Sequence, residues 1–421
     1  MAEFAGIMAA FAVIMVMIKK KAPLALAMVC ASLIVLLSSG KKLAFTLELF
    51  WSAVVDRDTV DLVLIVALVT ALAALMNRHG FFDEMVTALG TMLRNDQLTL
   101  MIVPGLIGSM PMVGGAIVSA PIVDHIGEGL NLSRAARSAV NLIFRHSWHF
   151  VFPFMPTLIL AARLADTSIQ RLIWTQWPLA AVMLLSGYYF VLARKENPTP
   201  PACGRQGAPG ETATPGAAVR SFLFHSSPII ISLVLHLGFG LHLALSLCVA
   251  MALAVILLTC VRRPEGLVPS SLPLQIIRDV DYPIAAAMAG IMIFRASVGE
   301  TGAFNDLMTT MVGAGLPLSF ITAALAGVMG FVSASHTSTV AVVVPVVTPI
   351  ALSMGKGVLV QVTLAYSFAL LAYLISPLHL CQILSNRYFG VSFGEVARLC
   401  LPVVIAVALA TVGMGILHGG L

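Results

Sequence analysis

Long apolar stretches separated by short polar segments run through the whole chain. In the first half they lie near residues 3–18, 23–39, 60–77, 136–163 and 172–193. Most of these stretches are close to the roughly 20 residues that an α-helix needs to cross the hydrocarbon core of a bilayer. The longer one at 136–163 is broken by Pro153 and Pro156. A β-barrel would instead show short segments of alternating polarity. The pattern therefore predicts an all-α polytopic membrane protein.

The same series of apolar stretches begins again in the second half. The second set lies near residues 222–241, 243–261, 282–298, 358–386 and 396–418. Between the two sets, residues 194–220 are rich in proline, glycine and threonine, which is typical of a flexible linker. We therefore expect a first repeat at 1–193, a linker at 194–220 and a second repeat at 221–421.

Matching residues recur at a nearly constant spacing between the two halves. At an offset of 222 residues, Gly105 and Gly108 correspond to Gly327 and Gly330. At an offset of 224, the matching pairs are Pro153 with Pro377, Ser168 with Ser392, and Pro178 with Pro402. Several coincidences at one spacing indicate an internal repeat.

Each half also contains an apolar segment interrupted by small and polar residues, at 98–127 and at 317–354. Between Gly327 and Pro345, neither apolar flank of the polar part is long enough alone to cross a bilayer. Irregular backbone at membrane depth persists only where protein buries it or where it lines an aqueous cavity. We therefore predict two re-entrant helical hairpins whose tips lie inside the membrane, where secondary transporters hold substrates and ions.

The distribution of lysine and arginine predicts the orientation. If each hairpin enters and leaves on one side, each half has five transmembrane helices, and the two repeats are inverted. The side that receives Lys19, Arg78, Arg137 and the linker then carries most of the basic residues, so it is cytoplasmic by the positive-inside rule. Both termini are predicted to lie outside the cell (inner) membrane, and the linker inside.

Composition argues against several other classes of protein. Of the 421 residues, 59% are hydrophobic and 10% are charged, and the net charge of +5 comes from loop lysines and arginines. Because no basic patch with interleaved aromatic residues exists, nucleic-acid binding is not expected. The six cysteines have no CxxC spacing, so neither a zinc site nor a disulfide framework is indicated. The start of the chain lacks the features of a cleaved signal peptide, so residues 3–18 are predicted to be a retained helix.

Five helices, a re-entrant hairpin and a proline-broken helix, repeated with opposite topology, resemble the ion transporter superfamily. That group includes divalent anion/sodium symporters, gluconate permeases and lactate permeases. The segments GSMPMVGGAIVSAP, from Gly108, and ISPLHLC, from Ile375, more closely resemble an uncharacterised bacterial and archaeal branch of it. The resemblance implies a homodimeric secondary transporter whose hairpins move in a transport domain against a scaffold by an elevator mechanism. No cofactor is expected, other than a possible sodium ion.

The hairpin tips depart from the best-known pattern of that superfamily. Its divalent-anion symporters carry a Ser-Asn-Thr motif at both tips. This chain has Ser109-Met110-Pro111 at the first tip and Ser335-His336-Thr337 at the second. The substrate and sodium assignments of the symporters therefore do not transfer directly.

The two tips are nevertheless the predicted substrate site. Backbone N–H groups at the start of each second arm lie at the positive end of a helix dipole, which favours anions. Gly114 and Gly115 let a ligand approach the backbone closely. Hydroxyl groups at the tips can bind a ligand directly, or they can simply cap the helix. The candidate substrate contacts are Ser109, Gly114, Gly115, Ser335, His336, Thr337, Ser338 and Thr339.

Arg145 is the candidate for recognising charge. It lies about nine residues into its apolar span, or ~14 Å deep at ~1.5 Å per residue. A charge at this depth is costly and usually functional. Its planar guanidinium suits a carboxylate or a phosphate. The alternative is an arginine that only contacts the carbonyls of a neighbouring broken helix.

Histidines cluster around the proline breaks. His146 and His149 share one helical face, and His379 follows the break at Ser376-Pro377. His149 and His379 are assigned to the substrate, and His146 to ion coupling, since histidine titrates near neutrality. Sodium is the other candidate coupling ion, and it would bind carbonyls and hydroxyls, for which the candidates are Ser147, Ser333 and Ser376. No metal site is predicted, because zinc would need further ligands.

The predicted function is secondary active transport of a small organic anion, coupled to sodium or protons, rather than catalysis. One alternative is a cation/proton antiporter, but such proteins usually keep a membrane carboxylate, and the membrane-depth segments contain almost none. The other is an intramembrane enzyme that uses His146, His149 and His379 at a metal or as acid–base groups. Paired hairpins favour transport, because alternating access needs their symmetry and an enzyme does not.

Overall fold

The computed structural model describes residues 2–93, 95–108, 115–193, 214–262, 268–301 and 316–417, which form helices, turns and short connections without a β-strand. Six helical stretches in these ranges are long and apolar enough to cross a membrane. They are Arg57–Arg78, Pro215–Gly238, Leu243–Arg262, Tyr282–Gly299, His336–Ser353 and Phe393–Leu417. The prediction of an all-α, multi-pass membrane protein is confirmed.

The first half begins with an antiparallel helix pair and ends with a long helix that continues as a π-helical turn. Its elements are α1 (Ala2–Lys19), α2 (Leu24–Ser38), α3 (Leu43–Val55), α4 (Arg57–Arg78), α5 (Phe81–Leu93), α6 (Asp96–Gly108), α7 (Gly115–Gly129), α8 (Arg134–Ser147), η1 (Trp148–Phe150), α9 (Pro156–Leu164), α10 (Ile169–Gly187) and η2 (Tyr188–Leu192).

The described helices of the second half follow a similar order, and the segment between α14 and α16 lies outside the described residues. Its elements are α11 (Pro215–Leu233), η3 (Val234–Gly238), α12 (Leu243–Ile256), η4 (Leu257–Arg262), η5 (Pro269–Ser271), α13 (Leu272–Arg278), α14 (Tyr282–Gly299), α16 (Leu318–Ser333), α17 (His336–Ser353), α18 (Val358–Leu374), α19 (Leu380–Phe389) and α20 (Phe393–Leu417). The similar order agrees with two repeats, but the division into repeats and their inverted orientation both stay predictions.

Two boundaries differ from the expectation. Residues 215–220, predicted as linker, form the first turns of α11, because Thr214 caps the helix by accepting a hydrogen bond from the N–H of Ala217 and Pro215 stands at the first helical position. Helix α17, with 18 residues, is long and apolar enough to cross a membrane. The statement that neither flank of the second tip could cross alone was therefore wrong for this arm.

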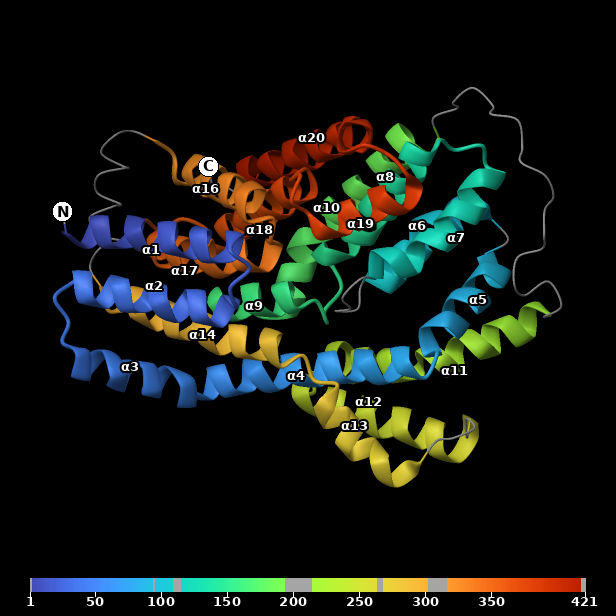
Figure 1. Ribbon diagram of the computed structural model, residues 1–421, viewed down its shortest axis with the longest axis horizontal. Helices are drawn as coiled ribbons and strands as arrows, with labels where there is room; N and C mark the ends of the chain where they lie inside the picture. The colour runs from blue at the N-terminus through green and yellow to red at the C-terminus, as the bar shows by residue number, and fades with distance from the viewer. Residues whose placement is uncertain are drawn as a thin grey trace.

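The helices form two groups that the chain visits alternately. Helices α1–α5 pack with α11–α14, and helices α6–α10 pack with α16–α20. Figure 1 shows α3, α4, α11 and α12 along the lower side of the molecule, and α8, α10, α19 and α20 along the upper side. We call these sets the first helix group and the hairpin group. Contact between them is limited to a few helix pairs, such as α4 with α9 and α14 with α17.

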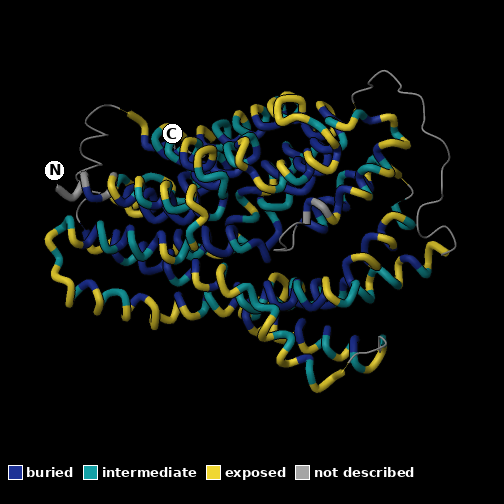
Figure 2. Tube along the Cα trace, in the orientation of Figure 1, coloured by how far each residue is buried: buried dark blue, intermediate teal, exposed yellow. Residues whose placement is uncertain are grey.

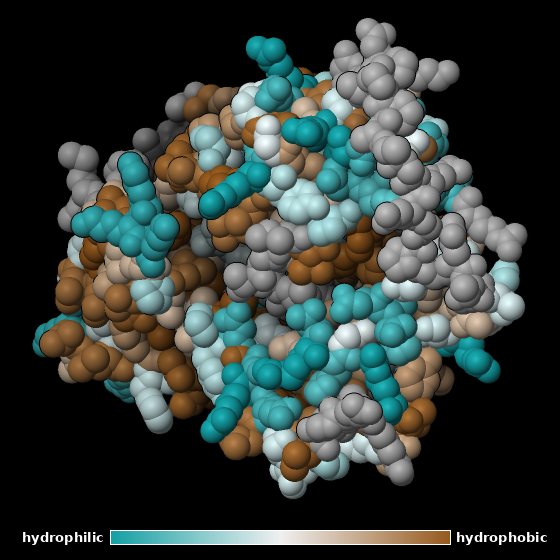
Figure 3. Space-filling model, turned by 45° about the vertical axis from the view of Figure 1, so that its right-hand side comes forward, coloured by the Kyte–Doolittle hydropathy of each residue, from teal (hydrophilic) through white to brown (hydrophobic). Residues whose placement is uncertain are grey.

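Burial follows this arrangement. Buried residues lie mainly inside the groups and where they meet, while α3 on the periphery is largely exposed (Figure 2). Hydrophobic residues cover the left flank of the molecule in Figure 3, and hydrophilic residues gather on the face toward the viewer. A membrane protein needs both kinds of surface, the apolar one for lipid and the polar one for water.

Both predicted hairpin segments consist of two helices that pack against each other, α6 with α7 and α16 with α17. In the second hairpin, Ala334 and Ser335 join the arms. Ala334 has φ of 47°, a left-handed conformation that ends α16. Ser335 then caps α17 by accepting a hydrogen bond from the N–H of Ser338. The predicted first-tip contacts Ser109 and Gly114 lie outside the described residues, and Gly115 begins α7.

Candidate functional site

Two broken helices of the hairpin group meet at the candidate site. The first break follows Ser147, where α8 passes into the 3₁₀ turn η1 before α9 starts at Pro156. The second lies between Leu374 at the end of α18 and Leu380 at the start of α19, around Pro377. Proline lacks the N–H that a continuing helix needs, so both breaks follow from the sequence.

Arg145 lies in the last turn of α8 and is only 5% exposed. Its Nη1 atom has no hydrogen-bond partner among the described residues. Gly108, the last residue of α6, packs directly on this side chain. In the part of the chain that the structure describes, Arg145 is the one charged side chain in the buried class. A buried guanidinium with an unpaired nitrogen is costly unless a ligand or water contacts it.

Four histidines lie beside one another, and His146 directly follows Arg145 in α8. The ring of His146 is 5.0 Å from that of His149 and 4.9 Å from that of His379, measured between centroids. His149 in turn lies 5.7 Å from His336 of the second hairpin tip. The structure therefore brings together the three histidines of the two breaks, and it adds His336 from α17. We call these four residues the histidine cluster.

Hydrogen bonds fix two of these rings. Nδ1 of His146 lies 2.7 Å from the carbonyl oxygen of Leu142, one turn earlier in α8. Nε2 of His336 lies 3.1 Å from the carbonyl oxygen of Tyr366. A carbonyl only accepts, so each of these nitrogens carries the proton in neutral histidine, and the other ring nitrogen is an acceptor. Nδ1 of His336 and Nδ1 of His149 have no hydrogen-bond partner among the described residues.

Two tyrosines of α18 border the histidine cluster, and neither was predicted from the sequence. The hydroxyl of Tyr366 donates to the carbonyl oxygen of His149 at 2.6 Å, so it holds the turn η1 in place. The ring of Tyr373 lies 3.7 Å from that of His379. A tyrosine within an apolar helix gives no signal of such a role, because only the packing of α18 against the first break reveals it.

Most hydroxyls of the second tip bond to one another rather than pointing into the cluster. Oγ of Ser335 lies 2.6 Å from Oγ of Ser338, and Oγ of Ser333 lies 3.2 Å from Oγ1 of Thr339. Thr339 also donates to the carbonyl oxygen of Ser335 at 2.8 Å. These contacts match the capping role considered above. Thr337 is different, because it reaches across to α9.

The two serines assigned to ion coupling at the breaks contact the backbone. The hydroxyl of Ser147 donates to the carbonyl oxygen of Phe144 at 2.8 Å, within α8. The hydroxyl of Ser376 donates to the carbonyl oxygen of Phe331 at 2.6 Å, so it ties the second break to the first arm of the second hairpin. Each of the two serine oxygens can still accept a further contact, since a hydroxyl oxygen has two lone pairs.

A second polar cluster, also missed from the sequence, joins α8 to α7 and α19. The side-chain oxygen of Asn141 accepts a hydrogen bond from the hydroxyl of Ser119 at 2.6 Å. The side-chain nitrogen of Asn141 donates to the hydroxyl oxygen of Ser385 at 3.2 Å. Ser138 contacts Ser385 at 3.0 Å and donates to Asn386 at 2.8 Å. Residues 138 and 385 are far apart in the chain, so no local pattern could have brought them together.

Three potential metal ligands also lie in the site. The ligand atoms of His146, His379 and Cys381 are within 4.8 Å of one another. Three ligands of this type suit zinc with one open position. The guanidinium of Arg145, however, lies near Cys381 and would repel a cation bound there. The residue types therefore fit a metal only in part, and they suit an anion better.

Residues 4–417 match the model of a family described as a protein of unknown function (DUF401). The chain belongs to this family. A comparison with curated proteins finds no match. The chain's membership of the ion transporter superfamily stays a prediction.

Among solved structures, the DUF401 chain is similar to the YdaH transporter of Alcanivorax borkumensis, whose crystal structure is described as having an unusual topology. The match covers 90% of each chain with a TM-score of 0.62 and 12% sequence identity. At this identity the likeness shows a shared fold alone. The two helix groups, the hairpins and the broken helices are thus parts of one fold that extends over nearly the whole chain.

Proposed function

We propose that this protein is a secondary active transporter of a small organic anion, such as a carboxylate. The observation that carries the proposal is the unpaired nitrogen of buried Arg145 beside the histidine cluster, at the meeting point of two broken helices and a hairpin tip. The likeness in fold to a protein named as a transporter supports the general class. Discontinuous helices at such a point are typical of secondary transporters.

The charge balance of the site favours an anion. The described residues include no aspartate or glutamate in the buried class. A neutral or cationic substrate would leave the Arg145 charge uncompensated at low dielectric, which is unfavourable. A carboxylate would accept two parallel hydrogen bonds from the guanidinium. The acceptor nitrogens of His146 and His336 can then take a hydroxyl hydrogen of the substrate or a coupling proton.

The coupling ion is proposed to be sodium or a proton. The histidine cluster supports protons, since histidine is the side chain that titrates near neutral pH. The buried oxygens of Ser138, Asn141 and Ser385 support sodium, because a hard cation prefers oxygen ligands. The sequence-based candidates Ser333 and Ser376 offer further oxygens close to the site.

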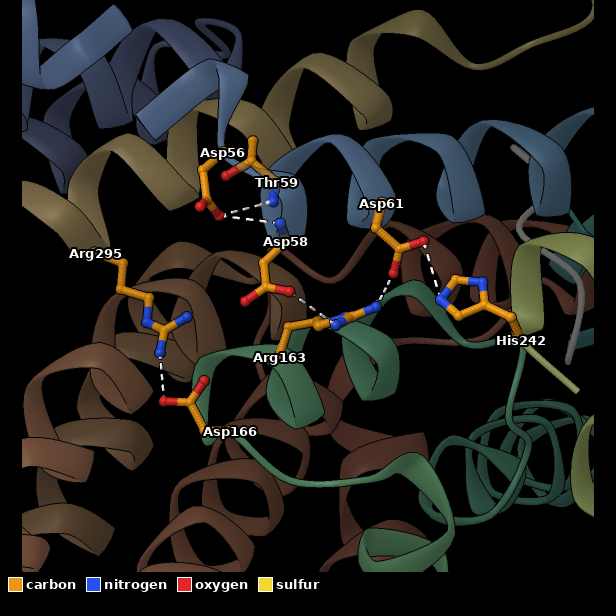
Figure 4. A network of polar contacts seen from close by, with 8 residues as sticks. All are labelled: Asp56, Asp58, Thr59, Asp61, Arg163, Asp166, His242 and Arg295. Atoms are coloured by element: carbon orange, nitrogen blue, oxygen red, sulfur yellow. Dashed lines mark hydrogen bonds and ion pairs between the residues drawn. The ribbon is translucent and has the colours of Figure 1, made fainter. Parts of the chain in front are cut away.

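An elevator mechanism is proposed from the two helix groups. Both hairpins and both breaks belong to the hairpin group, so the complete site could move as one body against the first helix group. Ion pairs join the two groups where α4 and α14 approach α9 and the turn after it (Figure 4). Exposed ion pairs are individually weak, typically 0 to about 1 kcal/mol, so they permit such a movement.

The remaining parts of the proposal rest on the sequence. The distribution of basic residues supports inverted repeats in the inner membrane, with both termini outside and the linker in the cytoplasm. The homodimer rests on the resemblance to the ion transporter superfamily. Cysteine-accessibility labelling of a residue in the linker and of both termini tests the orientation, and native mass spectrometry in lipid tests the dimer.

One observation favours a second candidate, an intramembrane enzyme. His146, His379 and Cys381 could hold a metal that activates water. Uptake experiments separate the two functions. Purified protein in proteoliposomes should accumulate a labelled carboxylate, phosphonate or sulfonate under a sodium or proton gradient, and Arg145→Ala should not. Conversion of the substrate without accumulation would favour the enzyme and overturn the transport proposal.

A further inference from the structure

A groove of about 360 Å³ opens on the outer surface of the hairpin group, between α10, α18 and α20. None of its lining residues belongs to the histidine cluster. Its walls include Arg171 and Trp174 from α10, Val360 and Thr363 from α18, and Met414 and Gly415 from α20. Most of the wall is apolar, so the groove fits a ligand with a hydrocarbon body.

The position of the groove along α20 places it near the membrane surface. Helix α20 has 25 residues, or ~37 Å at ~1.5 Å per residue, which exceeds the ~30 Å hydrocarbon core. Met414 and Gly415 stand within the last turn of this helix. The neighbouring Trp174 and Trp177 on α10 are 75% and 51% exposed. Exposed tryptophan is enriched where the hydrocarbon meets the lipid headgroups.

A single cation stands at the rim. Of the three arginines on α9, α10 and α14, Arg163 and Arg295 form ion pairs with aspartates, as Figure 4 shows. Arg171 forms no ion pair within the described ranges. Deeper in the groove, the hydroxyl oxygen of Thr363 is buried and has no hydrogen-bond partner among the described residues. A buried hydroxyl of this kind needs a partner from a ligand or from water.

We propose that this groove binds one anionic phospholipid. An acyl chain lies along the apolar wall formed by α18 and α20, the phosphate pairs with Arg171, and an ester or glycerol oxygen contacts Thr363. A water-soluble anion is a poorer occupant, because most of the wall is apolar and would stay uncovered. The lipid is already present in the surrounding bilayer at high local concentration, and the anionic headgroup complements the unpaired arginine.

The site would stabilise the part of the protein that holds the histidine cluster. Helix α18 lines the groove with Thr363, and it carries Tyr366 and Tyr373, which contact the histidine cluster. A lipid that bridges α10, α18 and α20 would favour the folded hairpin group, as any ligand specific for the native state does. This inference requires only a membrane protein, so it stands whether or not an anion is transported.

The test uses the full-length protein in nanodiscs that contain equal amounts of phosphatidylglycerol and phosphatidylcholine. Native mass spectrometry measures which lipid stays bound after the protein is released. Wild type should retain phosphatidylglycerol preferentially, and Arg171→Gln should reduce that preference about fivefold, the effect of one basic residue at an anionic surface. The matched control Arg57→Gln removes an exposed arginine of α4 in the first helix group and should leave the preference unchanged.

Two further variants separate the groove from general surface charge. Val360→Trp fills the groove and should lower retention of both lipids. If that variant does not fold, Thr363→Val keeps the shape and should lower retention of phosphatidylglycerol by removing one hydrogen bond. Wild-type preference in Arg171→Gln would overturn the proposal. An equal loss in Arg57→Gln would also overturn it, because the arginines would then act only as surface charge.

Discussion

Gly108 packs so closely on Arg145 that a Cβ added to the glycine would lie 2.2 Å from Cγ of the arginine. The second half contains the same contact: a Cβ on Gly330 would lie 2.7 Å from the carbonyl oxygen of Ala369. The two pairs are related by the offsets of 222 and 224 residues found in the sequence. This correspondence supports the predicted internal repeat, because in both halves a glycine of the first hairpin arm packs on the broken helix. Arg145 is the asymmetric element, since its counterpart is an alanine.

The contact of Gly330 predicts a stability effect. Gly330→Ala should destabilise the protein by about 1–3 kcal/mol, because backbone rather than a flexible side chain blocks the new methyl group. Gly327→Ala is the matched control in the same helix, since a Cβ there meets no atom within 4 Å. Thermal unfolding in detergent measures both variants. Equal melting temperatures for the two would contradict the close packing of α16 on α18.

Arg145 should decide substrate binding. Arg145→Ala should abolish binding of the anion while the protein stays folded, and Arg145→Lys should restore it only in part, because an ammonium lacks the planar fork. Arg134→Ala is the control, as Arg134 is an exposed arginine at the start of the same helix. Thermal-shift titration with small carboxylates reads out binding for all three. Wild-type affinity in Arg145→Ala would make the arginine structural.

Much of the fold could be predicted because membrane helices have a strong sequence signal. Long apolar runs, proline breaks and the repeat offset predicted most of the helices and both hairpin segments. Helices α3 and α13 were missed because, with 13 and 7 residues, they are too short for that signal. The linker boundary was missed for another reason. A Pro-Gly pair in a polar stretch is typical of a loop, yet here Thr214 and Pro215 start a helix.

The candidate site was predictable only where one residue type is unusual in its surroundings. Arg145 and the histidines stand out in apolar helices, and the structure places His146, His149, His336 and His379 together. Tyr366 and Asn141 do not stand out. Their partners come from other helices, so they can be found only after the helices are packed. The serines and threonines of the second tip were distinctive, but most of them cap the helix.

A contact across the hairpin group should be energetically coupled. Oγ1 of Thr337 at the second tip lies 2.6 Å from Oγ1 of Thr157 on α9. Thr337→Val and Thr157→Val should each lower stability by about 1 kcal/mol, and the double variant should cost less than the sum. A double-mutant cycle by thermal or chemical unfolding measures the coupling. Strict additivity would mean that the two hydroxyls act independently.

The metal alternative can be decided directly. If the cluster binds an anion, the purified protein should contain less than a stoichiometric amount of zinc after incubation with the metal and washing. Cys381→Ser and His379→Ala should then leave the zinc content unchanged, since Arg145 opposes a cation at this place. Elemental analysis measures the content. One zinc ion per chain that disappears in both variants would instead support the intramembrane enzyme.

The ion pairs between the two helix groups should control the conformational equilibrium more than stability. Arg163 of α9 pairs with Asp61 and, at 3.4 Å, with Asp58 of α4, and Asp61 also lies 3.3 Å from His242 at the start of α12. Because Arg163 is partly exposed, Arg163→Gln should cost no more than about 1 kcal/mol of unfolding free energy.

A free-energy change of about 1 kcal/mol would shift an equilibrium between two arrangements of the first helix group and the hairpin group about fivefold. Hydrogen–deuterium exchange should therefore rise along α9 and in the connection before α12, and the initial uptake rate should change. Arg78→Gln is the matched control, since Arg78 pairs with Asp279 inside the first helix group. Faster exchange in Arg163→Gln but not at these positions in Arg78→Gln would support a movement between the groups. Equal effects of the two variants would mean that the ion pairs only stabilise local structure, and the proposed elevator movement would lose this support.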